Sequence, residues 1–178
     1  LEPFQESHTC VPLIAGADIA EYISKAQEGP VGVLLSGDTG FYSGAKRLWA
    51  LLGDHEVVTL PGISSLSYFC AKLHTDWQDV KIVSAHGRSH NVVGEIQRSA
   101  RTFALTGGNT KAQDICRELT DRGLGSVTVS VGERLSYADE RIVTGTAAEL
   151  AEEAFADLAV LLAENPDLHT TKADKSAH

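Results

Sequence analysis

The sequence predicts an α/β protein, because short β-branched apolar runs alternate in its first half with segments whose apolar residues recur at helical spacing. The run at 31–36 ends abruptly in the turn 37–40, which reads Gly-Asp-Thr-Gly, and a second run at 57–60 stops at Pro61-Gly62. Glycine supplies the backbone angles that such sharp turns need. Strands that alternate with helices in this way pair in parallel through right-handed crossovers. Because ligands bind beyond the carboxyl ends of such strands, we place the binding site at these two turns.

The first half of the chain alternates three predicted helices with three predicted strands. In the first helix, Ile19, Tyr22 and Ile23 recur at helical spacing while the opposite face is polar. Gly53 is placed to end the second helix, and Ser64 or Ser65 can cap the third. In chain order we expect a helix at 17–27, a strand at 31–36, a helix at 44–52, a strand at 57–60, a helix at 64–73 and a strand at 80–85.

The second half uses the same kinds of element in a less regular order. A strand at 101–106 is stopped by Gly107-Gly108, and Asn109 or Thr110 can cap the helix that follows. Further along we expect a helix to Leu119, a turn at 122–125, strands at 126–131 and 141–143, a helix from Thr146 to about Glu153 and a strand at 158–162.

The organisation of the chain follows from these elements. A boundary within 92–100 gives an N-terminal α/β lobe at 1–95 and a C-terminal α/β lobe at 96–164. The stretch 165–178 is polar and has no periodicity, so we expect it to be a disordered tail.

Composition and charge exclude several classes of protein. With 178 residues, 43% of them hydrophobic, the chain can bury a substantial core. Its formal net charge of −9 argues against a nucleic-acid surface, which needs a basic stripe. No run approaches the ~18 consecutive apolar residues of a membrane span, and no leader sequence marks secretion. We therefore expect a cytoplasmic protein that binds neither nucleic acid nor a membrane.

The cysteines fit the same compartment. Cys10, Cys70 and Cys116 are far apart and odd in number, so they indicate neither a disulfide framework nor a zinc site, and we expect no metal. Cys70 and Cys116 lie on apolar faces of predicted helices and are expected in the core, because free cysteine behaves as a small hydrophobe. A reducing cytoplasm agrees with this usage.

Local patterns leave the chemistry open between ligand binding and plain structure. The P-loop and the ordinary Rossmann fingerprint are both missing from the sequence. Asp38 could hold a ribose hydroxyl or a cation, or it could bond to its own turn. Ser64 and Ser65 could contact a ligand or only cap a helix, and Gly107-Gly108 read alone is a strand-to-helix turn.

His86 is a candidate for proton transfer, because it follows the strand at 80–85 and precedes Gly87 and Arg88. Histidine titrates near neutral pH, so at a strand end it can act as an acid, a base or a substrate contact. A structural role is the alternative. The guanidinium of Arg88 can bind a carboxylate with two parallel hydrogen bonds.

Three motifs, in this order and at these separations, resemble the tetrapyrrole (corrin and porphyrin) methylase family: Ser36 to Tyr42, Pro61 to Ser65 and Ser84 to Arg88. Together with 132–137 and 140–142 downstream, the third motif is most similar to the branch of that family that methylates carbon 5 of a precorrin in cobalamin biosynthesis. The resemblance covers residues 1–164, and the combination of motifs carries it.

The resemblance implies a two-lobed α/β fold with a mostly parallel sheet in the N-terminal lobe and a mixed sheet in the C-terminal lobe. It also implies a homodimeric enzyme that binds S-adenosylmethionine between the lobes and methylates a corrin precursor. The first strand of the family ends in a Gly-x-Gly-Pro-Gly turn, and nothing similar precedes Leu1. We therefore expect the N-terminal lobe to lack that strand.

The resemblance also assigns roles to residues at matching positions. As a separate hypothesis, motivated by its position at a strand end, His86 accepts the proton lost from the methylated carbon or orients a ring carboxylate, and Arg88 pairs with acetate or propionate groups. We expect the cofactor-binding loops to converge on one pocket. The implied cofactor contacts are Gly37, Asp38, Phe41, Ser64, Ser65, Thr106, Gly107 and Leu135.

Two other functions stay open. The first is another branch of the same family, such as a methylase for uroporphyrinogen or for diphthamide formation, although the His-Gly-Arg turn argues against both. The second is a non-catalytic module that binds a small molecule with a degenerate version of the fold.

Overall fold

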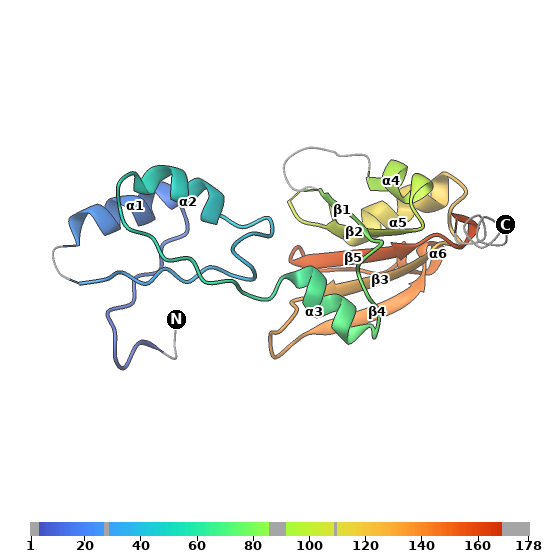
Figure 1. Cartoon of the computed structure of the whole chain (residues 1–178). Helices are drawn as coiled ribbons and strands as arrows, with labels where there is room; N and C mark the ends of the chain where they lie inside the picture. Colours follow the sequence, from blue (N-terminus) through green and yellow to red (C-terminus); the bar gives the residue numbers. More distant parts are fainter. Residues whose placement is uncertain (1–3, 27–28, 86–91, 109, 169–178) are drawn as a thin grey trace. The chain divides into compact units, whose positions relative to one another are not determined.

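A computed structural model describes residues 4–26, 29–85, 92–108 and 110–168 of the chain (Figure 1). By its internal contacts the chain divides into two compact units, Leu1–Ser64 and Ser65–His178, here called unit 1 and unit 2. This division differs from the predicted lobes at 1–95 and 96–164. The reason is that β1 (Lys81–Ser84) pairs in parallel with β2 (Arg101–Leu105), so the stretch between them joins two strands of one sheet.

Unit 1 contains two amphipathic helices, α1 (Gly16–Lys25) and α2 (Ala45–Leu52), which lie side by side (Figure 1). Both agree with the predicted helices at 17–27 and 44–52. The apolar face of α2 is buried, because Leu48 and Leu52 recur at helical spacing and are each less than a tenth exposed. Gly53 ends α2 with a φ of +54°, as its sequence position predicted.

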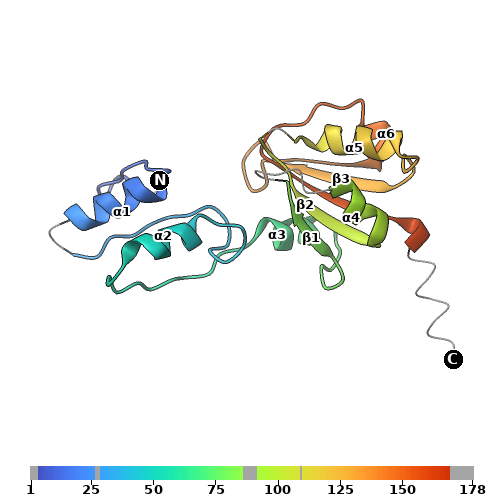
Figure 2. The same cartoon turned by 90° about the horizontal axis from the view of Figure 1, so that it is seen from above.

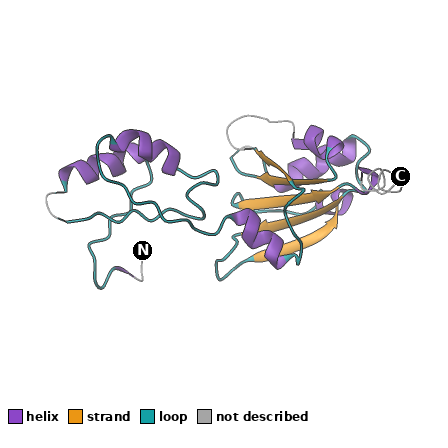
Figure 3. Cartoon of the chain, viewed as in Figure 1, coloured by secondary structure: helices purple, strands orange, loops and turns teal. Residues whose placement is uncertain are grey.

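The strands predicted at 31–36 and 57–60 are wrong, because neither segment pairs with another strand among the described residues. Figure 3, in which strands are orange, draws both as loops, and unit 1 shows no strand within 4–26 and 29–64. A parallel strand is stable when it is paired and buried on both faces. Here Leu34 and Val58 are 61% and 80% exposed. The mostly parallel sheet expected for the N-terminal lobe is therefore not seen in unit 1.

Unit 2 is built on one five-stranded mixed sheet with the order β1-β2-β5-β3-β4. Besides β1 and β2 it contains β3 (Thr128–Glu133), β4 (Arg141–Thr146) and β5 (Ala159–Glu164). The pair β1–β2 is parallel, whereas β2–β5, β5–β3 and β3–β4 are antiparallel. The mixed sheet expected for the C-terminal lobe is confirmed, with β4 three residues longer than the predicted strand at 141–143.

Helices cover both faces of this sheet. Three of them, α4 (Val92–Arg98), α5 (Ala112–Asp121) and α6 (Ala147–Leu150), pack into one hydrophobic core with the strands. The remaining helix, α3 (Ser65–Lys72), lies on the opposite face from α5 (Figure 2). Alternation along the strands sends successive side chains to the two faces. Fully buried core residues on the α5 face include Ile96, Ile115, Leu119, Val129, Val131 and Leu161.

Local sequence explains how the helices of unit 2 begin. The Thr146 hydroxyl accepts a hydrogen bond from the Glu149 N–H, and the Glu149 carboxylate accepts one from the Thr146 N–H at 2.8 Å, which forms a capping box at the start of α6. At α5 the Asp114 carboxylate likewise accepts a hydrogen bond from the Lys111 N–H at 3.1 Å. The sequence analysis predicted the start of α6 at Thr146 correctly. It placed the end of that helix at about Glu153 instead of Leu150, and it predicted no helix at α4.

The predicted tail at 165–178 begins with an ordered residue. Asn165 is only 3% exposed, and its side chain donates a hydrogen bond to the Ile96 carbonyl at 3.0 Å while its N–H bonds to the Ala100 carbonyl at 2.8 Å. These bonds fasten the chain to the end of α4. The prediction of disorder is thus wrong for 165–168, and 169–178 lie outside the described residues.

The cysteines occupy the predicted positions. Cys70 and Cys116 are buried, in α3 and α5, whereas Cys10 is partly exposed, and none of the three forms a disulfide. Burial raises the pKa of the Cys70 thiol, and it raises that of Cys116 to about 12. Both buried thiols are therefore protonated core side chains at neutral pH.

Candidate functional site

The first predicted turn is held by the side chain of Asp38. One carboxylate oxygen accepts a hydrogen bond from the Gly40 N–H at 2.6 Å, and the Asp38 carbonyl accepts one from the Phe41 N–H at 3.1 Å. Gly37 has a φ of +74°, a conformation that residues with a side chain rarely adopt. Asp38 therefore does bond to its own turn. Its second carboxylate oxygen has no donor among the described residues and is free to accept a hydrogen bond from a ligand.

The second predicted turn packs directly against the first. A Cβ atom at Gly62 would lie 2.2 Å from the carbonyl oxygen of Gly37 and 3.5 Å from the Cα of Asp38. Real Cβ atoms do not approach a backbone oxygen so closely, so this arrangement requires glycine at position 62. The Thr39 hydroxyl also bonds to the Leu60 carbonyl at 3.4 Å. The structure thus brings together the two turns at which the sequence places the site.

Two more predicted cofactor contacts belong to unit 1. Phe41 is half-buried and lies edge-on against Tyr42, with 5.2 Å between ring centroids. Tyr42 has a φ of +50°, so the left-handed backbone seen at Gly37 recurs at this residue. Ser64 is buried and immediately precedes α3, whose first residue is the half-buried Ser65 of unit 2.

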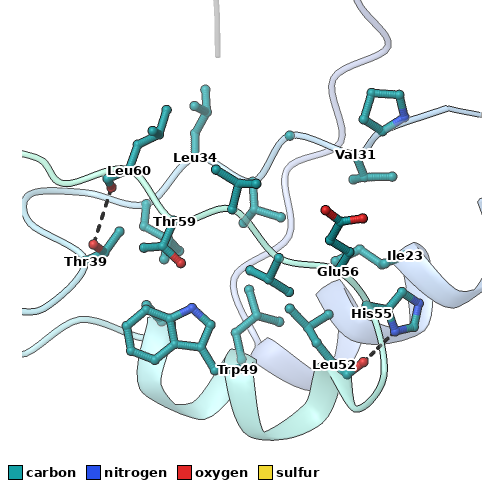
Figure 4. A pocket seen from close by; sticks show the side chains of 18 of the residues that line it. Ile23, Val31, Leu34, Thr39, Trp49, Leu52, His55, Glu56, Thr59 and Leu60 are labelled. Atoms are coloured by element: carbon teal, nitrogen blue, oxygen red, sulfur yellow. Dashed lines mark hydrogen bonds between the residues drawn. The ribbon is translucent and has the colours of Figure 1, made fainter.

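A cavity of about 700 Å³ lies in unit 1 beside these turns (Figure 4). Its walls come from α1, α2 and the segments 31–35 and 57–62, and they are mainly apolar, with Trp49 and Leu60 among the side chains drawn in Figure 4. Gly37, Thr39 and Gly62 line it, whereas Asp38, Phe41 and Ser64 do not. The cavity is therefore a mainly apolar space next to the two turns, and of the predicted cofactor contacts in unit 1 it is lined by Gly37.

Thr106 and Gly107 form the turn at the carboxyl end of β2. The Thr106 hydroxyl donates to the Ala159 carbonyl at 2.8 Å, and Gly107 and Thr110 exchange backbone hydrogen bonds of 3.0 and 3.4 Å. Gly107 and Gly108 have φ angles of +145° and +64°, which favour glycine. Because the Thr106 hydroxyl donates to a carbonyl of β5, this side chain anchors the turn.

Leu135 lies in the loop that follows β3, between two residues with a left-handed backbone. Arg134 and Ser136 have φ angles of +49° and +68°, which residues other than glycine adopt only when the surroundings enforce it. A Cβ atom at Gly132 would lie 2.9 Å from a methyl carbon of Leu135 and 2.6 Å from the Phe69 ring of α3. The loop and the helix therefore meet over Gly132.

The sequence reading missed a carboxylate at the end of this loop. Glu140 accepts hydrogen bonds from the Tyr68 hydroxyl and from the Ser136 N–H, both at 2.7 Å, and it pairs with the Lys72 ammonium at 2.9 Å. The Ser136 N–H, followed by Tyr68 and Lys72, lowers the pKa of Glu140 to about 2. Tyr68 and Lys72 are four residues apart on one face of the predicted helix at 64–73, which was the available signal for a shared partner.

The two predicted catalytic residues, His86 and Arg88, lie outside the described residues. Their roles stay predictions. So does the convergence of the loops on one pocket, because the predicted contacts from Gly37 to Ser64 belong to unit 1, and Ser65, Thr106, Gly107 and Leu135 belong to unit 2.

Other kinds of site find no support in the part of the chain that the structure describes. Within 4–26, 29–85, 92–108 and 110–168, no group of three or more histidine, cysteine, aspartate or glutamate side chains is placed to hold a metal ion. Within the same ranges, every helix is too short or too polar to cross a lipid bilayer.

Comparison with known proteins links this geometry to a family. Residues 6–151 match the family model described as Tetrapyrrole (Corrin/Porphyrin) Methylases. The chain is 34% identical over 130 residues to the cobalt-precorrin-7 C(5)-methyltransferase of Salmonella typhimurium, a match that covers 71% of this chain and 64% of that enzyme. The chain thus spans a little less than two thirds of the length of this relative.

Solved structures share the fold. The precorrin-6Y methylase from Archaeoglobus fulgidus matches with a TM-score of 0.65 and 21% identity, over 89% of this chain and 74% of that one. A uroporphyrin-III C-methyl transferase from Thermus thermophilus, complexed with S-adenyl homocysteine, matches with a TM-score of 0.55 and 21% identity, over 72% of this chain and 60% of that one. The predicted α/β fold class is therefore confirmed.

Proposed function

This chain belongs to the tetrapyrrole (corrin/porphyrin) methylase family, and from that membership we propose that it transfers a methyl group from S-adenosylmethionine to carbon 5 of a precorrin. The observation that carries the proposal is the 34% identity with a cobalt-precorrin-7 C(5)-methyltransferase. The sequence motifs at 84–88, 132–137 and 140–142 favour the same branch of the family. The substrate is a small corrin precursor, and neither nucleic acid nor a membrane takes part.

Each unit, taken by itself, offers groups of the kind that an adenosyl group binds. Asp38 has a free carboxylate oxygen, and a ribose diol presents the hydroxyl donors that such an oxygen binds. In the turn after β2, Gly107 is buried and bonds to Thr110 through its own N–H and carbonyl, whereas the next residue, Gly108, is exposed. Leu135 is half-buried beside Phe69 and adds an apolar surface of the kind that a purine ring needs.

The proposed mechanism asks little side-chain chemistry of the protein. When bound, S-adenosylmethionine supplies a sulfonium methyl group that is already activated toward a carbon nucleophile. The chain has to hold the electron-rich ring carbon in line with that methyl group and to exclude water. We assign to His86 the acceptance of the proton that leaves the methylated carbon, and to Arg88 the pairing with acetate or propionate carboxylates of the ring.

Two experiments test the function. Calorimetry with S-adenosylmethionine and S-adenosylhomocysteine should detect binding of both ligands, because the two share the adenosyl group and the amino acid tail. Incubation with a panel of precorrins and a methyl-labelled donor should then place label at carbon 5 of one of them. A chain that binds neither ligand would end the proposal, and label at another ring position, or on uroporphyrinogen, would move the chain to another branch of the family.

The catalytic assignment is tested by His86→Ala and Arg88→Ala. We expect the first to lower kcat and the second to raise KM for the precorrin, with S-adenosylhomocysteine affinity unchanged in both. Arg122→Ala is the matched control, since this exposed arginine after α5 forms its ion pair with Glu118, away from the predicted site residues. If both site variants kept the turnover and the substrate affinity of the wild type, the assignment would be wrong.

We also propose that the chain acts as a homodimer in the cytoplasm. The support is the resemblance to the family together with the cysteine usage, in which the two cysteines of unit 2 are buried and reduced. Light scattering coupled to size-exclusion chromatography measures the mass directly. A species of 19.0 kDa at micromolar concentration would contradict the dimer.

A further inference from the structure

Side chains of a single helix bind both carboxylate oxygens of Glu140. In α3, Tyr68 and Lys72 stand one turn apart, and the Lys72 ammonium lies 5.3 Å from the centroid of the Tyr68 ring. The Tyr68 hydroxyl donates to one oxygen of Glu140 at 2.7 Å, and the ammonium pairs with the other at 2.9 Å. The side chain of Glu140 is only 17% exposed. Such charge-assisted bonds fix the end of the loop to the helix.

The same carboxylate reaches back into its own loop. The oxygen that binds Tyr68 also accepts the Ser136 N–H at 2.7 Å. Ser136 and Arg134 both have left-handed backbone angles, and such residues persist only where surrounding contacts over-determine them. Besides the Glu140 contact, the loop is held by the Arg134 N–H on the Leu158 carbonyl and the Tyr137 N–H on the Arg134 carbonyl, each at 3.0 Å, and by the ion pair of Arg134 with Asp139 at 2.8 Å; none of these contacts reaches α3. Glu140 is therefore the side chain that stabilises this conformation from the α3 side.

The loop conformation decides where Leu135 lies. Leu135 sits between the two left-handed residues, and one of its methyl carbons would lie 2.9 Å from a Cβ at Gly132. The Phe69 ring of α3, which is fully buried, comes to 2.6 Å of the same point. Leu135 is thus packed beside α3 only as long as the loop keeps its left-handed turns. Without the Glu140 carboxylate, the Ser136 N–H loses its acceptor and the loop loses its polar link to α3.

We propose that Glu140 is a positioning residue for ligand binding: through Ser136 and Tyr68 it locks the loop 134–137 onto α3 and thereby presents Leu135 to the adenosyl group. The consequence for the ligand rests on the function proposed above. The lock itself rests only on contacts within unit 2. Glu140 touches neither ligand nor substrate in this scheme, so its removal changes affinity through Leu135.

The test measures S-adenosylhomocysteine affinity by calorimetry and backbone protection by hydrogen exchange. Glu140→Ala should weaken binding by at least about tenfold, the effect of losing one good polar constraint, and should raise the exchange rate of the 134–137 amides. Glu140→Gln keeps one oxygen acceptor and should recover part of the affinity. Tyr68→Phe removes one donor from the carboxylate and should have a smaller effect in the same direction.

Glu149→Gln is the matched control. Glu149 also accepts a backbone N–H, that of Thr146 at 2.8 Å, and this hydrogen bond lowers its pKa, but it caps α6 instead of the loop. This variant should lower stability while leaving affinity and the exchange of 134–137 unchanged. If Glu149→Gln lost as much affinity as Glu140→Ala, the effect of Glu140 on binding would come from general stability and not from the position of the loop.

The outcomes separate the two proposals. Wild-type affinity and wild-type exchange in a folded Glu140→Ala protein would overturn the lock. If the wild-type chain bound no S-adenosylhomocysteine, the proposed function and the ligand role of Glu140 would both fall. The exchange of 134–137 in Glu140→Ala would then decide the lock by itself.

Discussion

Replacing Gly62 with alanine is expected to force apart the two turns on which the candidate site depends. The new Cβ would lie 2.2 Å from the Gly37 carbonyl oxygen and 3.1 Å from its carbonyl carbon. Ordinary contacts of a Cβ atom begin at 3.4 Å, so the two backbones would have to separate by about 1.2 Å. A backbone carbonyl has no rotamers through which to yield, and the displacement therefore falls on the turns themselves.

The size of the effect follows from this displacement. Overpacking of this kind lowers the free energy of unfolding by about 1–3 kcal/mol. A displacement of about 1 Å in a positioning loop can lower the rate of a reaction by about 100-fold. We therefore expect Gly62→Ala to lose about 1–3 kcal/mol in urea denaturation and to bind S-adenosylhomocysteine at least about tenfold more weakly in calorimetry.

Gly44→Ala is the control for this experiment. Gly44 also lies in unit 1, has a φ of −64° and would place its Cβ in open space, with no atom within 4 Å. Alanine at this position should therefore leave both stability and affinity unchanged. If Gly62→Ala behaved like Gly44→Ala in both measurements, the contact between the two turns would not exist in solution and the site built on it would be wrong.

Three further predictions concern unit 2. Phe103→Ala should cost about 3–5 kcal/mol in urea denaturation because its ring is fully buried, and a loss below about 1 kcal/mol would contradict that burial. Thr146→Ala should cost about 1 kcal/mol by removing the cap of α6, whereas Thr146→Ser should retain most of it; equal losses in the two variants would exclude the hydroxyl as the cause. Glu140 has a pKa lowered to about 2 in the folded chain against an ordinary value of 4.5, so it stabilises the chain fully above pH 4.5 and progressively less as the pH falls toward 2. The difference in unfolding free energy between wild type and Glu140→Gln should therefore shrink between pH 5 and pH 2, and a constant difference would refute the lowered pKa.

Local sequence was sufficient for the elements that carry their own signals. Helix α2 shows apolar residues at helical spacing with Gly53 at its end, and Thr146 with Glu149 marks the start of α6. In the interior of unit 2, the apolar run 158–162 became β5, because it inserts between β2 and β3 and is buried by both neighbours. These elements depend on residues close in sequence or on an apolar run that the sheet encloses.

Pairing was not predictable from the same evidence. The runs at 31–36 and 57–60 have the β-branched composition of strands, yet Leu34 and Val58 stay exposed because no described strand lies beside them. Composition sets the preference for an extended backbone, whereas a sheet also needs a partner that is distant in sequence. For this reason the assignment of these two runs as strands was wrong.

The candidate site divides in the same way. The turns at Gly37 and Gly62 were predicted from glycine placement, since each turn is a local feature. Glu140 was missed because its partners, Tyr68 and Lys72, lie about 70 residues upstream, and only the packing of α3 against the loop brings them together. Residues that act by joining distant segments need a structure to be found.

The three cysteine thiols differ in exposure, so unit 1 can be labelled selectively. Cys70 and Cys116 are enclosed in unit 2 and stay protonated, and a protonated thiol is a poor nucleophile. Cys10 is partly open to solvent in unit 1. A maleimide dye applied at neutral pH should therefore attach at Cys10 first, so that fluorescence reports on the N-terminal unit of the native sequence without any engineered handle.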